Sequence, residues 1–330
     1  MTQVVEGPDG RRLSVEIAGD PDGTPVFLLH GTPGGSNGPR PRGIIIYRLG
    51  IRLISYNRPG YPGSDRREGR TVADAATDVA AIADFFRIGR FSVVGRSGGA
   101  PHALACAALL SDRVTCAAAL GSLAPYDAEG LDWSAGMADS NVRAYLDAEQ
   151  DLGALIATLN EHAGLVRNNS EGLLEVLWPE LVGPDKEAIG DIALRQIIAR
   201  VHADALRDSA DGWIDDVIAL SRPWGFDLSD ITMPVKLWSG SEDVFSPAAH
   251  THWLAKRITS ANLEVDTSKA HFGAVQILPK ILAWVAEKAD AAGHGLADSA
   301  MHLLRRSNSG LAHGGKRPDR SPVMRAVIRS

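Results

Sequence analysis

Cysteine is scarce in this chain, with only two among 330 residues. Cys106 falls in a segment of helical character and Cys116 in the apolar run that follows it, so the two need not pair. Such sparse usage does not fit a secreted domain held together by disulfides. We therefore expect two buried free thiols and a cytoplasmic protein.

Long hydrophobic runs and an excess of positive charge are also missing. No stretch approaches the roughly 20 apolar residues of a membrane-spanning helix. The N-terminus has no basic region followed by an apolar one, so we expect neither a signal peptide nor a membrane partner. The net charge of −6 gives no reason to expect a nucleic-acid partner.

The first 120 residues alternate between strand-like and helix-like patterns. The turn Pro8-Asp9-Gly10 separates two short segments that we predict to form a hairpin. Later apolar runs read as strands buried on both faces, with helical spacing between them. The predicted strands are 25–29, 51–56, 91–94 and 114–120, and the predicted helices are 40–49, 71–87 and 98–110. This order predicts an α/β fold with a mostly parallel, doubly wound sheet.

The alternation stops between residues 124 and 230, where helical periodicity continues without a convincing strand. We interpret this segment as a helical cap inserted over the carboxyl edge of the sheet. Strand patterns return at 235–240 and 262–266, with helices at about 247–258 and 275–289. The predicted organisation is a core of residues 1–123 and 231–291, a cap of residues 124–230 and a mobile basic tail of residues 292–330.

The stretch around Ser97 organises the predicted site. The run Gly95-Arg96-Ser97-Gly98-Gly99 joins a short apolar strand directly to an alanine-rich helix. A serine in so sharp a turn takes a strained backbone conformation, and its neighbours must be small because the strand and helix cross closely. This pattern predicts a nucleophile elbow that presents the Ser97 hydroxyl at the end of the strand.

Two later loops supply the partners that a serine nucleophile needs. Asp243 follows the strand at 235–240, and His271 follows the strand at 262–266. The carboxyl ends of parallel strands share one edge, so these loops should converge on Ser97. We predict His271 as the general base and Asp243 as the acid that orients it, with the adjacent Glu242 as the alternative acid.

At this point the chain resembles the α/β-hydrolase fold family, from Val4 to about Ala291. The resemblance implies a serine hydrolase whose oxyanion hole is formed by the backbone N–H groups of Thr32 and Gly98. Asn57 stands where the family usually has Asp, and Pro62 where glycine is common, and both departures concern loop structure. The motifs that carry the resemblance are His30-Gly31-Thr32-Pro33-Gly34, the loop from Asn57 to Asp65, the elbow, and the Asp243 and His271 loops.

Several further residues are candidates for the substrate pocket. Arg96 precedes the nucleophile, and we expect it to pair with a neighbouring acid, with a bias toward anionic substrates as the alternative. Four tryptophans, Trp133, Trp178, Trp213 and Trp224, lie in the helical segment, where some of them could face a substrate. The pocket candidates are His30, Arg96, Trp133, Trp224, Phe245 and Phe272.

The histidines do not suggest a metal. His30 is expected to shape the oxyanion loop and His102 to pack in the core. His250 and His252 stand two apart with no carboxylate cluster at ligand spacing. We therefore expect no metal and no cofactor.

The predicted reaction is cleavage of a carboxylic ester, thioester or lactone, as in a carboxylesterase, with a small-molecule acyl substrate. A prolyl-type aminopeptidase is the alternative, in which Glu149, Glu161 or Glu180 would grip an amino group. The fold also serves non-hydrolytic proteins such as ligand receptors, lyases or perhydrolases. A homodimer is possible on this sequence.

Overall fold

The computed structural model describes residues 2–289 and residue 291, and in them eight strands form one sheet in the order β1-β2-β4-β3-β5-β6-β7-β8. Strands β1 and β2 pair antiparallel, β2 also pairs antiparallel with β4, and all other neighbours pair in parallel. The predicted mostly parallel sheet and its opening hairpin are confirmed. The strands are β1 (Thr2–Glu6), β2 (Arg12–Gly19), β3 (Thr24–Leu29), β4 (Ile51–Tyr56), β5 (Phe91–Arg96), β6 (Val114–Leu120), β7 (Val235–Gly240) and β8 (Ala261–Asp266).

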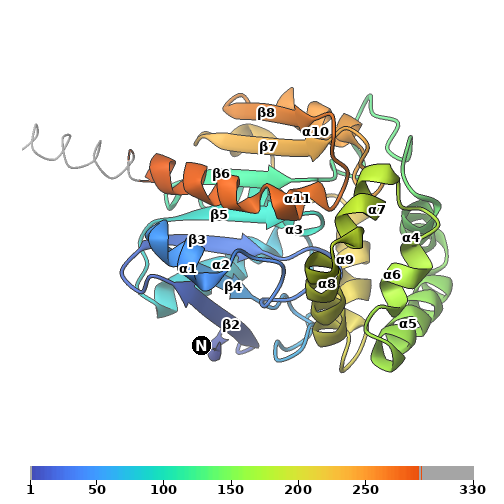
Figure 1. Cartoon of the computed structure of the whole chain (residues 1–330). Coiled ribbons are helices and arrows are strands. Elements are labelled where there is room, and N and C mark those ends of the chain that lie inside the picture. Colours follow the sequence, from blue (N-terminus) through green and yellow to red (C-terminus); the bar gives the residue numbers. More distant parts are fainter. Residues whose placement is uncertain (1, 290, 292–330) are drawn as a thin grey trace, which may run out of the picture. The chain divides into compact units, whose positions relative to one another are not determined.

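Helices cover both faces of this sheet and the carboxyl ends of its parallel strands (Figure 1). In the described chain they are α1 (Gly43–Arg48), α2 (Asp74–Phe85), α3 (Gly99–Leu109), α4 (Asp139–Gln150), α5 (Leu152–Asn168), α6 (Gly172–Leu177), α7 (Gly183–Gly190), α8 (Ile192–Ala205), α9 (Asp211–Leu220), the 3-10 helix η1 (Leu228–Asp230), α10 (Ala248–Ala255) and α11 (Gly273–Gln276), followed by helical residues 278–289.

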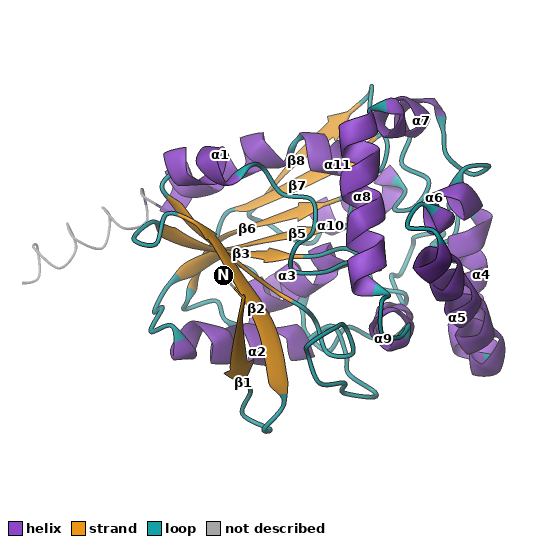
Figure 2. Ribbon diagram, turned by 60° about the horizontal axis from the view of Figure 1, so that its bottom comes forward, coloured by secondary structure: helices purple, strands orange, loops and turns teal. Residues whose placement is uncertain are grey.

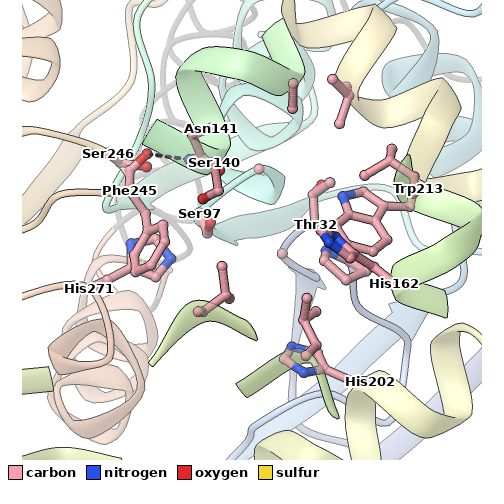
Figure 3. Close-up of a pocket in the computed structure, with 18 of the residues that line it drawn as sticks. Thr32, Ser97, Ser140, Asn141, His162, His202, Trp213, Phe245, Ser246 and His271 are labelled. Atoms are coloured by element: carbon pink, nitrogen blue, oxygen red, sulfur yellow. Dashed lines mark hydrogen bonds between the residues drawn. The ribbon is translucent and has the colours of Figure 1, made fainter. Parts of the chain in front are cut away.

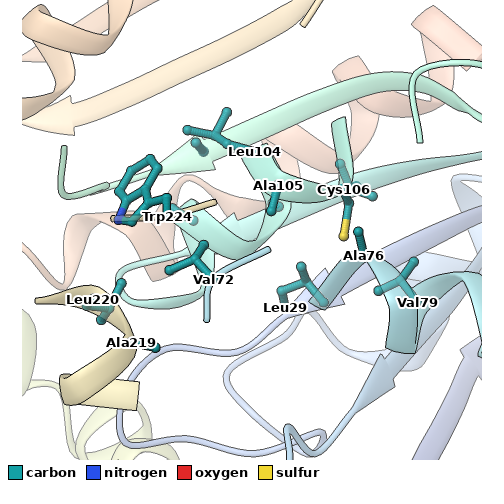
Figure 4. Close-up of a cluster of buried hydrophobic side chains, with 14 of the residues drawn as sticks. Leu29, Val72, Ala76, Val79, Leu104, Ala105, Cys106, Ala219, Leu220 and Trp224 are labelled. Atoms are coloured by element: carbon teal, nitrogen blue, oxygen red, sulfur yellow. The ribbon is translucent and has the colours of Figure 1, made fainter. Parts of the chain in front are cut away.

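The two faces of the sheet feed two separate hydrophobic cores. Val26 and Leu28 of β3 pack into the core beneath α1 and the helix at 278–289, whereas Phe27 and Leu29 pack into the core beneath α2 and α3. Successive side chains of a strand point to opposite faces, so a strand buried on both sides is apolar without interruption. Figure 2 shows α1 on one side of the sheet and α2 and α3 on the other, and Figure 4 shows Leu29 in the second core.

The last helix differs from the sequence expectation. A single helix from about residue 275 to 289 was expected, but α11 ends at Gln276 and a new helix begins at residue 278. Pro279 explains the break, because proline has no backbone N–H and its ring collides with the carbonyl four residues earlier. Proline is tolerated in the first turn of a helix, which is where Pro279 lies.

The segment between β6 and β7 is helical, as the sequence predicts. In the described chain, α4 to α9 and η1 occupy it without a strand. Figure 1 shows these helices beyond the arrowheads of the parallel strands, next to the edge where the predicted site residues emerge. The boundaries of a separate cap domain stay a prediction, and the predicted tail at 292–330 lies outside the described residues.

Cys106 and Cys116 are both free and buried, which confirms the prediction of unpaired thiols. Over residues 2–289, no helix is both long and apolar enough to cross a membrane.

Candidate active site

Ser97 lies in the predicted sharp turn between β5 and α3. Its φ angle is 53°, a left-handed conformation that residues with side chains seldom adopt. The Ser97 N–H donates to the carbonyl of Leu120 on β6 at 2.8 Å, and the Ser97 carbonyl accepts from Ala100 at 2.8 Å. These bonds hold the strained residue between strand and helix.

The glycines on either side of Ser97 make this turn possible. A Cβ atom on Gly95 would lie 2.2 Å from the Gly99 carbonyl oxygen, and one on Gly99 would lie 2.3 Å from the His30 carbonyl oxygen. Both distances are far below van der Waals contact, so no other residue fits without moving the backbone. The two glycines thus let β5 and α3 cross closely enough to project Ser97 from the strand end.

Asp243 and His271 form a buried pair at the ends of β7 and β8. His271 Nδ1 lies 3.1 and 3.0 Å from the two carboxylate oxygens of Asp243. Asp243 Oδ1 also accepts the backbone N–H groups of Phe245 at 2.9 Å and Ser246 at 2.8 Å, which fixes the carboxylate. Glu242 is exposed, so Asp243 is the carboxylate beside the imidazole.

The surroundings of His271 favour its protonated form. Burial by itself lowers the pKa of the imidazole, but the charge and hydrogen bond of Asp243 outweigh it. Asp185 acts in the same direction and Arg96 in the opposite one, and the pKa of His271 ends above its usual value. An imidazole of this kind accepts a proton readily at its other nitrogen, Nε2.

Ser97 and His271 line the same cavity, which has a volume of about 340 Å³. Figure 3 shows Ser97 between His271 and Thr32 in this view of the cavity. In the described part of the chain, the Ser97 hydroxyl and the imidazole do not form a hydrogen bond. Catalytic hydrogen bonds are often long without substrate and tighten when it binds. The cavity therefore brings nucleophile and base to one place without fixing their contact.

Thr32 and Gly98 lie against each other beside Ser97. A Cβ atom on Gly98 would lie 2.3 Å from Thr32 Oγ1, so only glycine fits there. The backbone N–H groups of Thr32 and Gly98 have no acceptor among residues 2–289. Gly98 is the N-cap of α3, where N–H groups lack partners within the helix. Two free donors next to a serine can bind a developing oxyanion.

Asp216 is a buried carboxylate that the sequence analysis did not identify, and it holds the loop that carries Thr32, here called the oxyanion loop. Asp216 of α9 is fully buried and accepts hydrogen bonds from Thr32 Oγ1 at 2.7 Å and the Tyr61 hydroxyl at 2.8 Å. It also pairs with Arg58 at 2.5 Å and Arg70 at 2.6 Å. Burial by itself raises the pKa of Asp216, but these two guanidinium groups hold it well below its usual range.

Asn57, which stands where the resemblance leads us to expect Asp, stabilises its loop through hydrogen bonds of its side-chain amide. Its side-chain oxygen accepts the N–H of Ser36 at 2.6 Å, and its side-chain nitrogen donates to the carbonyl of Pro62 at 2.7 Å. A carboxylate could make only the first of these bonds. The amide thus ties the two loops together without any contact to Ser97 or His271.

A second missed carboxylate, Asp185, lies in α7 and is fully buried. It accepts the backbone N–H groups of His271 at 3.2 Å and Phe272 at 2.8 Å. Burial raises the pKa of Asp185. A residue of the helical segment therefore holds the loop that carries the candidate base.

Three pocket candidates line the cavity and three do not. Arg96, Phe245 and Phe272 line it, whereas His30, Trp133 and Trp224 lie outside its lining. His30 lies below the loop, where Nδ1 bonds to the Gly31 carbonyl at 2.8 Å and Nε2 accepts the Arg58 N–H at 3.2 Å. That position fits the expected role in shaping the oxyanion loop.

The two tryptophans are occupied elsewhere. Trp224 is 3% exposed and packs beside Val72 and Leu220 in the core beneath α2 and α3 (Figure 4). Trp133 packs against His250 and donates its indole N–H to the carbonyl of Ala124 at 3.0 Å. Neither indole therefore faces the substrate cavity.

Other aromatic and polar side chains of the helical segment take their place. Trp213 lines the cavity with His162, their rings 6.2 Å apart, and His202 lies on the same side in Figure 3. Asn141 lines the cavity on the other side, next to Ser246. Trp213, one of the four tryptophans considered, lies within α9, whereas Trp224 lies in the loop after it, between Pro223 and Gly225. Nothing in the local sequence marks His162 or His202 as pocket residues.

Arg96 contradicts the expectation of a salt bridge. In the part of the chain that the structure describes, its guanidinium takes part in no ion pair and no hydrogen bond. Burial lowers the pKa of Arg96 to about 10, so the side chain stays charged at neutral pH. In the same residues, no group of three or more His, Cys, Asp or Glu side chains could hold a metal ion.

The comparisons with known proteins show the family and the fold of this chain. The chain matches the model of the alpha/beta hydrolase fold family over residues 24–274. It is 33% identical over 105 residues to a proline iminopeptidase of Neisseria meningitidis (serogroup A) and 32% identical over 110 residues to one of Arabidopsis thaliana. These matches cover 30% and 32% of this chain and 33% and 29% of those relatives, so they span only about a third of either protein.

Solved structures match over a much larger part of the chain. An enol-lactonase of Burkholderia xenovorans LB400 has a TM-score of 0.63 at 16% identity and covers 87% of this chain and 99% of its own. An esterase of Exiguobacterium antarcticum has a TM-score of 0.59 at 21% identity and covers 88% of this chain and 100% of its own. At such low identity these likenesses show the fold alone.

Proposed function

Because the chain belongs to the alpha/beta hydrolase fold family, we propose that it is a serine hydrolase that cleaves a carboxylic ester, thioester or lactone. One observation carries the proposal. Ser97 projects from a strained turn into a cavity that His271 also lines. The Nδ1 atom of His271 is hydrogen-bonded to Asp243. A nucleophile and a base in one cavity, with an acid hydrogen-bonded to the base, are the parts that acyl transfer requires.

The proposed reaction begins when the Ser97 hydroxyl attacks the carbonyl carbon of the substrate. His271 Nε2 takes the serine proton, and Asp243 stabilises the imidazolium. The N–H groups of Thr32 and Gly98 bind the oxyanion of the tetrahedral intermediate. The imidazolium then protonates the departing alcohol or thiol, leaving an acyl-enzyme. Water, deprotonated by His271, releases the acid and restores Ser97.

Covalent labelling tests this proposal directly. A fluorophosphonate should label the native protein at Ser97, and short-chain nitrophenyl esters should be hydrolysed. Ser97→Ala should abolish labelling and lower kcat by about a millionfold, because loss of the nucleophile disables the whole triad. Ser246→Ala, which changes another cavity serine, is the matched control and should retain labelling. A native protein that takes up no label and cleaves no acyl substrate would favour a ligand receptor instead.

An aminopeptidase is the second candidate, and the partial likeness to proline iminopeptidases favours it. Such an enzyme would need a carboxylate for the substrate's ammonium group. Glu149, Glu161 and Glu180, proposed for this task, do not line the cavity, and Asp147 is the one carboxylate among its lining residues. The aminopeptidase would therefore depend on Asp147, whereas the esterase proposal needs no carboxylate in the cavity, so we retain the esterase as the first proposal. Faster cleavage of proline amides than of matched esters would reverse this preference.

A further inference from the structure

Arg96 places an unneutralised cation beside the nucleophile. It is the last residue of β5 and lines the cavity that holds Ser97. Arg96 Nη2 and Ser97 Cβ each lie 3.4 Å from the position that a Cβ atom on Gly31 would take, so they are at most twice that distance apart. The guanidinium therefore lies within reach of any short substrate whose carbonyl is at Ser97.

The buried carboxylates around the candidate site are engaged with other groups. Asp243 and Asp185 bond to the His271 loop, and Asp216 bonds to Arg58 and Arg70. None of these three carboxylates lines the cavity. Among residues 2–289, no carboxylate forms an ion pair with Arg96.

The remaining charges of the cavity wall do not balance Arg96 either. Arg143 and Asp147 also line the cavity, one helical turn apart on α4, and their two charges sum to zero. His202 is partly buried, and this burial, followed by the charge of Arg96, lowers the pKa of His202 to about 4, so it is neutral at pH 7. His202 Nδ1 also has no hydrogen-bond partner. The wall around Arg96 is therefore positive and offers an unused polar atom.

We propose that Arg96 forms a carboxylate-binding subsite, so that the substrate is an ester or lactone with a second, ionised carboxylate a short chain away from the reacting carbonyl. This inference rests on the proposed function and names its substrate class. A guanidinium presents two parallel N–H donors that match both oxygens of a carboxylate. A partly buried cation without a partner is costly, and an anionic substrate group would relieve that cost on binding.

The test compares two substrates that differ only at the far end. Monoethyl glutarate carries a carboxylate there, and ethyl glutaramate carries a neutral amide of the same shape. The measured quantity is the ratio of kcat/KM for the two, from ethanol release at pH 8, where the carboxylate is ionised and Arg96 is protonated. We expect the native protein to prefer the carboxylate. Matched succinate and adipate pairs then locate the best chain length.

Three variants assign this preference to Arg96. Arg96→Gln should lower the ratio about tenfold to a hundredfold, as expected for loss of a charged hydrogen bond. Arg96→Lys, which keeps the charge but loses the paired donors, should retain part of the preference. Arg200→Gln is the control because it removes an equal charge from the exposed surface of α8, outside the cavity, and it should keep the native ratio.

The outcomes separate this subsite from the proposed function. If the native protein cleaves ethyl glutaramate as fast as the carboxylate, or if Arg96→Gln leaves the ratio unchanged, the subsite is wrong and the hydrolase stands. If neither ester is cleaved and no fluorophosphonate reacts, the hydrolase is wrong. Calorimetric titration of monomethyl glutarate then decides the subsite: binding that Arg96→Gln abolishes supports it, and absence of binding overturns it. If Arg96→Gln does not fold, Arg96→Lys serves in both assays.

Discussion

Ser97 and His271 depend on neighbours that place them in conformations or charge states they would not take alone. Ser97 has a positive φ angle because its backbone is bonded to β6 and α3. His271 has a raised pKa because Asp243 faces its Nδ1. At the residue scale, the reactivity proposed for Ser97 and His271 therefore depends on the neighbouring groups that hold each of them.

The raised pKa of His271 predicts the pH dependence of the reaction. The base must be neutral, so kcat/KM should rise with pH as His271 loses its proton, with a midpoint above the usual histidine value. Asp243→Asn removes the charge that stabilises the imidazolium. The midpoint should then move to lower pH, while the plateau falls by roughly ten-thousandfold. Ester hydrolysis from pH 5 to 9 measures both effects, and a midpoint that moves upward would contradict this assignment.

Gly98→Ala should damage the oxyanion hole. Its new Cβ would lie 2.3 Å from Thr32 Oγ1 and 2.7 Å from Thr32 Cβ, so Thr32 must move. Displacing one oxyanion donor should lower kcat by about a hundredfold to a thousandfold. Gly43→Ala is the matched control, since a Cβ there meets no atom within 4 Å. Equal kcat values for the two variants would remove Thr32 and Gly98 from the proposed mechanism.

At the scale of secondary structure elements, the helical segment supplies buried charges to the loops of the sheet. Helix α7 provides Asp185, which holds the His271 loop, and α9 provides Asp216, which holds Thr32. Both carboxylates come from outside the strands that carry the proposed triad. The helices between β6 and β7 are therefore expected to position the site as well as to line its cavity.

Asp216→Asn should strongly destabilise the protein. Removing this charge leaves Arg58 and Arg70 buried without a counter-ion, which typically costs about 3–5 kcal/mol. The neighbouring Asp215 pairs with Arg66, whose side chain is 35% exposed, so Asp215→Asn should cost about 1 kcal/mol or less. Urea denaturation measures both free energies of unfolding. Similar losses for the two variants would show that the Asp216 network does not stabilise the fold.

At the scale of the whole molecule, two cores lie on opposite faces of one sheet. The residues of β3 alternate between these cores, so neither core can open without disturbing the strand. Cys106 of α3 belongs to one core and Cys116 of β6 to the other. The two thiols therefore report on the two faces of the sheet separately.

Neither thiol should react with Ellman's reagent in the native protein. Both are buried, burial raises the pKa of each, and the thiolate is the reactive form. In urea, both should react at the rate of global unfolding. Reducing agent should leave Tm unchanged, because neither Cys106 nor Cys116 is in a disulfide. Rapid labelling of one thiol in the absence of urea would reveal that its core opens locally.

The sequence alone determined the sheet, the elbow and the convergence of Ser97, Asp243 and His271. Strand periodicity and the small residues around Ser97 are local features, and parallel strands bring their carboxyl ends to one edge wherever they occur. The family match over residues 24–274 confirms the resemblance that these motifs carried.

Only the tertiary structure decided how the helical segment meets this edge. Both tryptophans lie in the segment predicted to be helical, but Trp213 of α9 lines the cavity, whereas Trp224 lies in the loop after α9 and packs in the core. Contacts between distant segments also decided that Asp185 bonds to the His271 loop and that Asp216 pairs with Arg58 and Arg70. The same contacts gave Arg96 no ion-pair partner among the described residues. Helical periodicity tells which side of a helix is buried, but the angle at which helices pack sets which residues meet, and long-range contacts fix that angle.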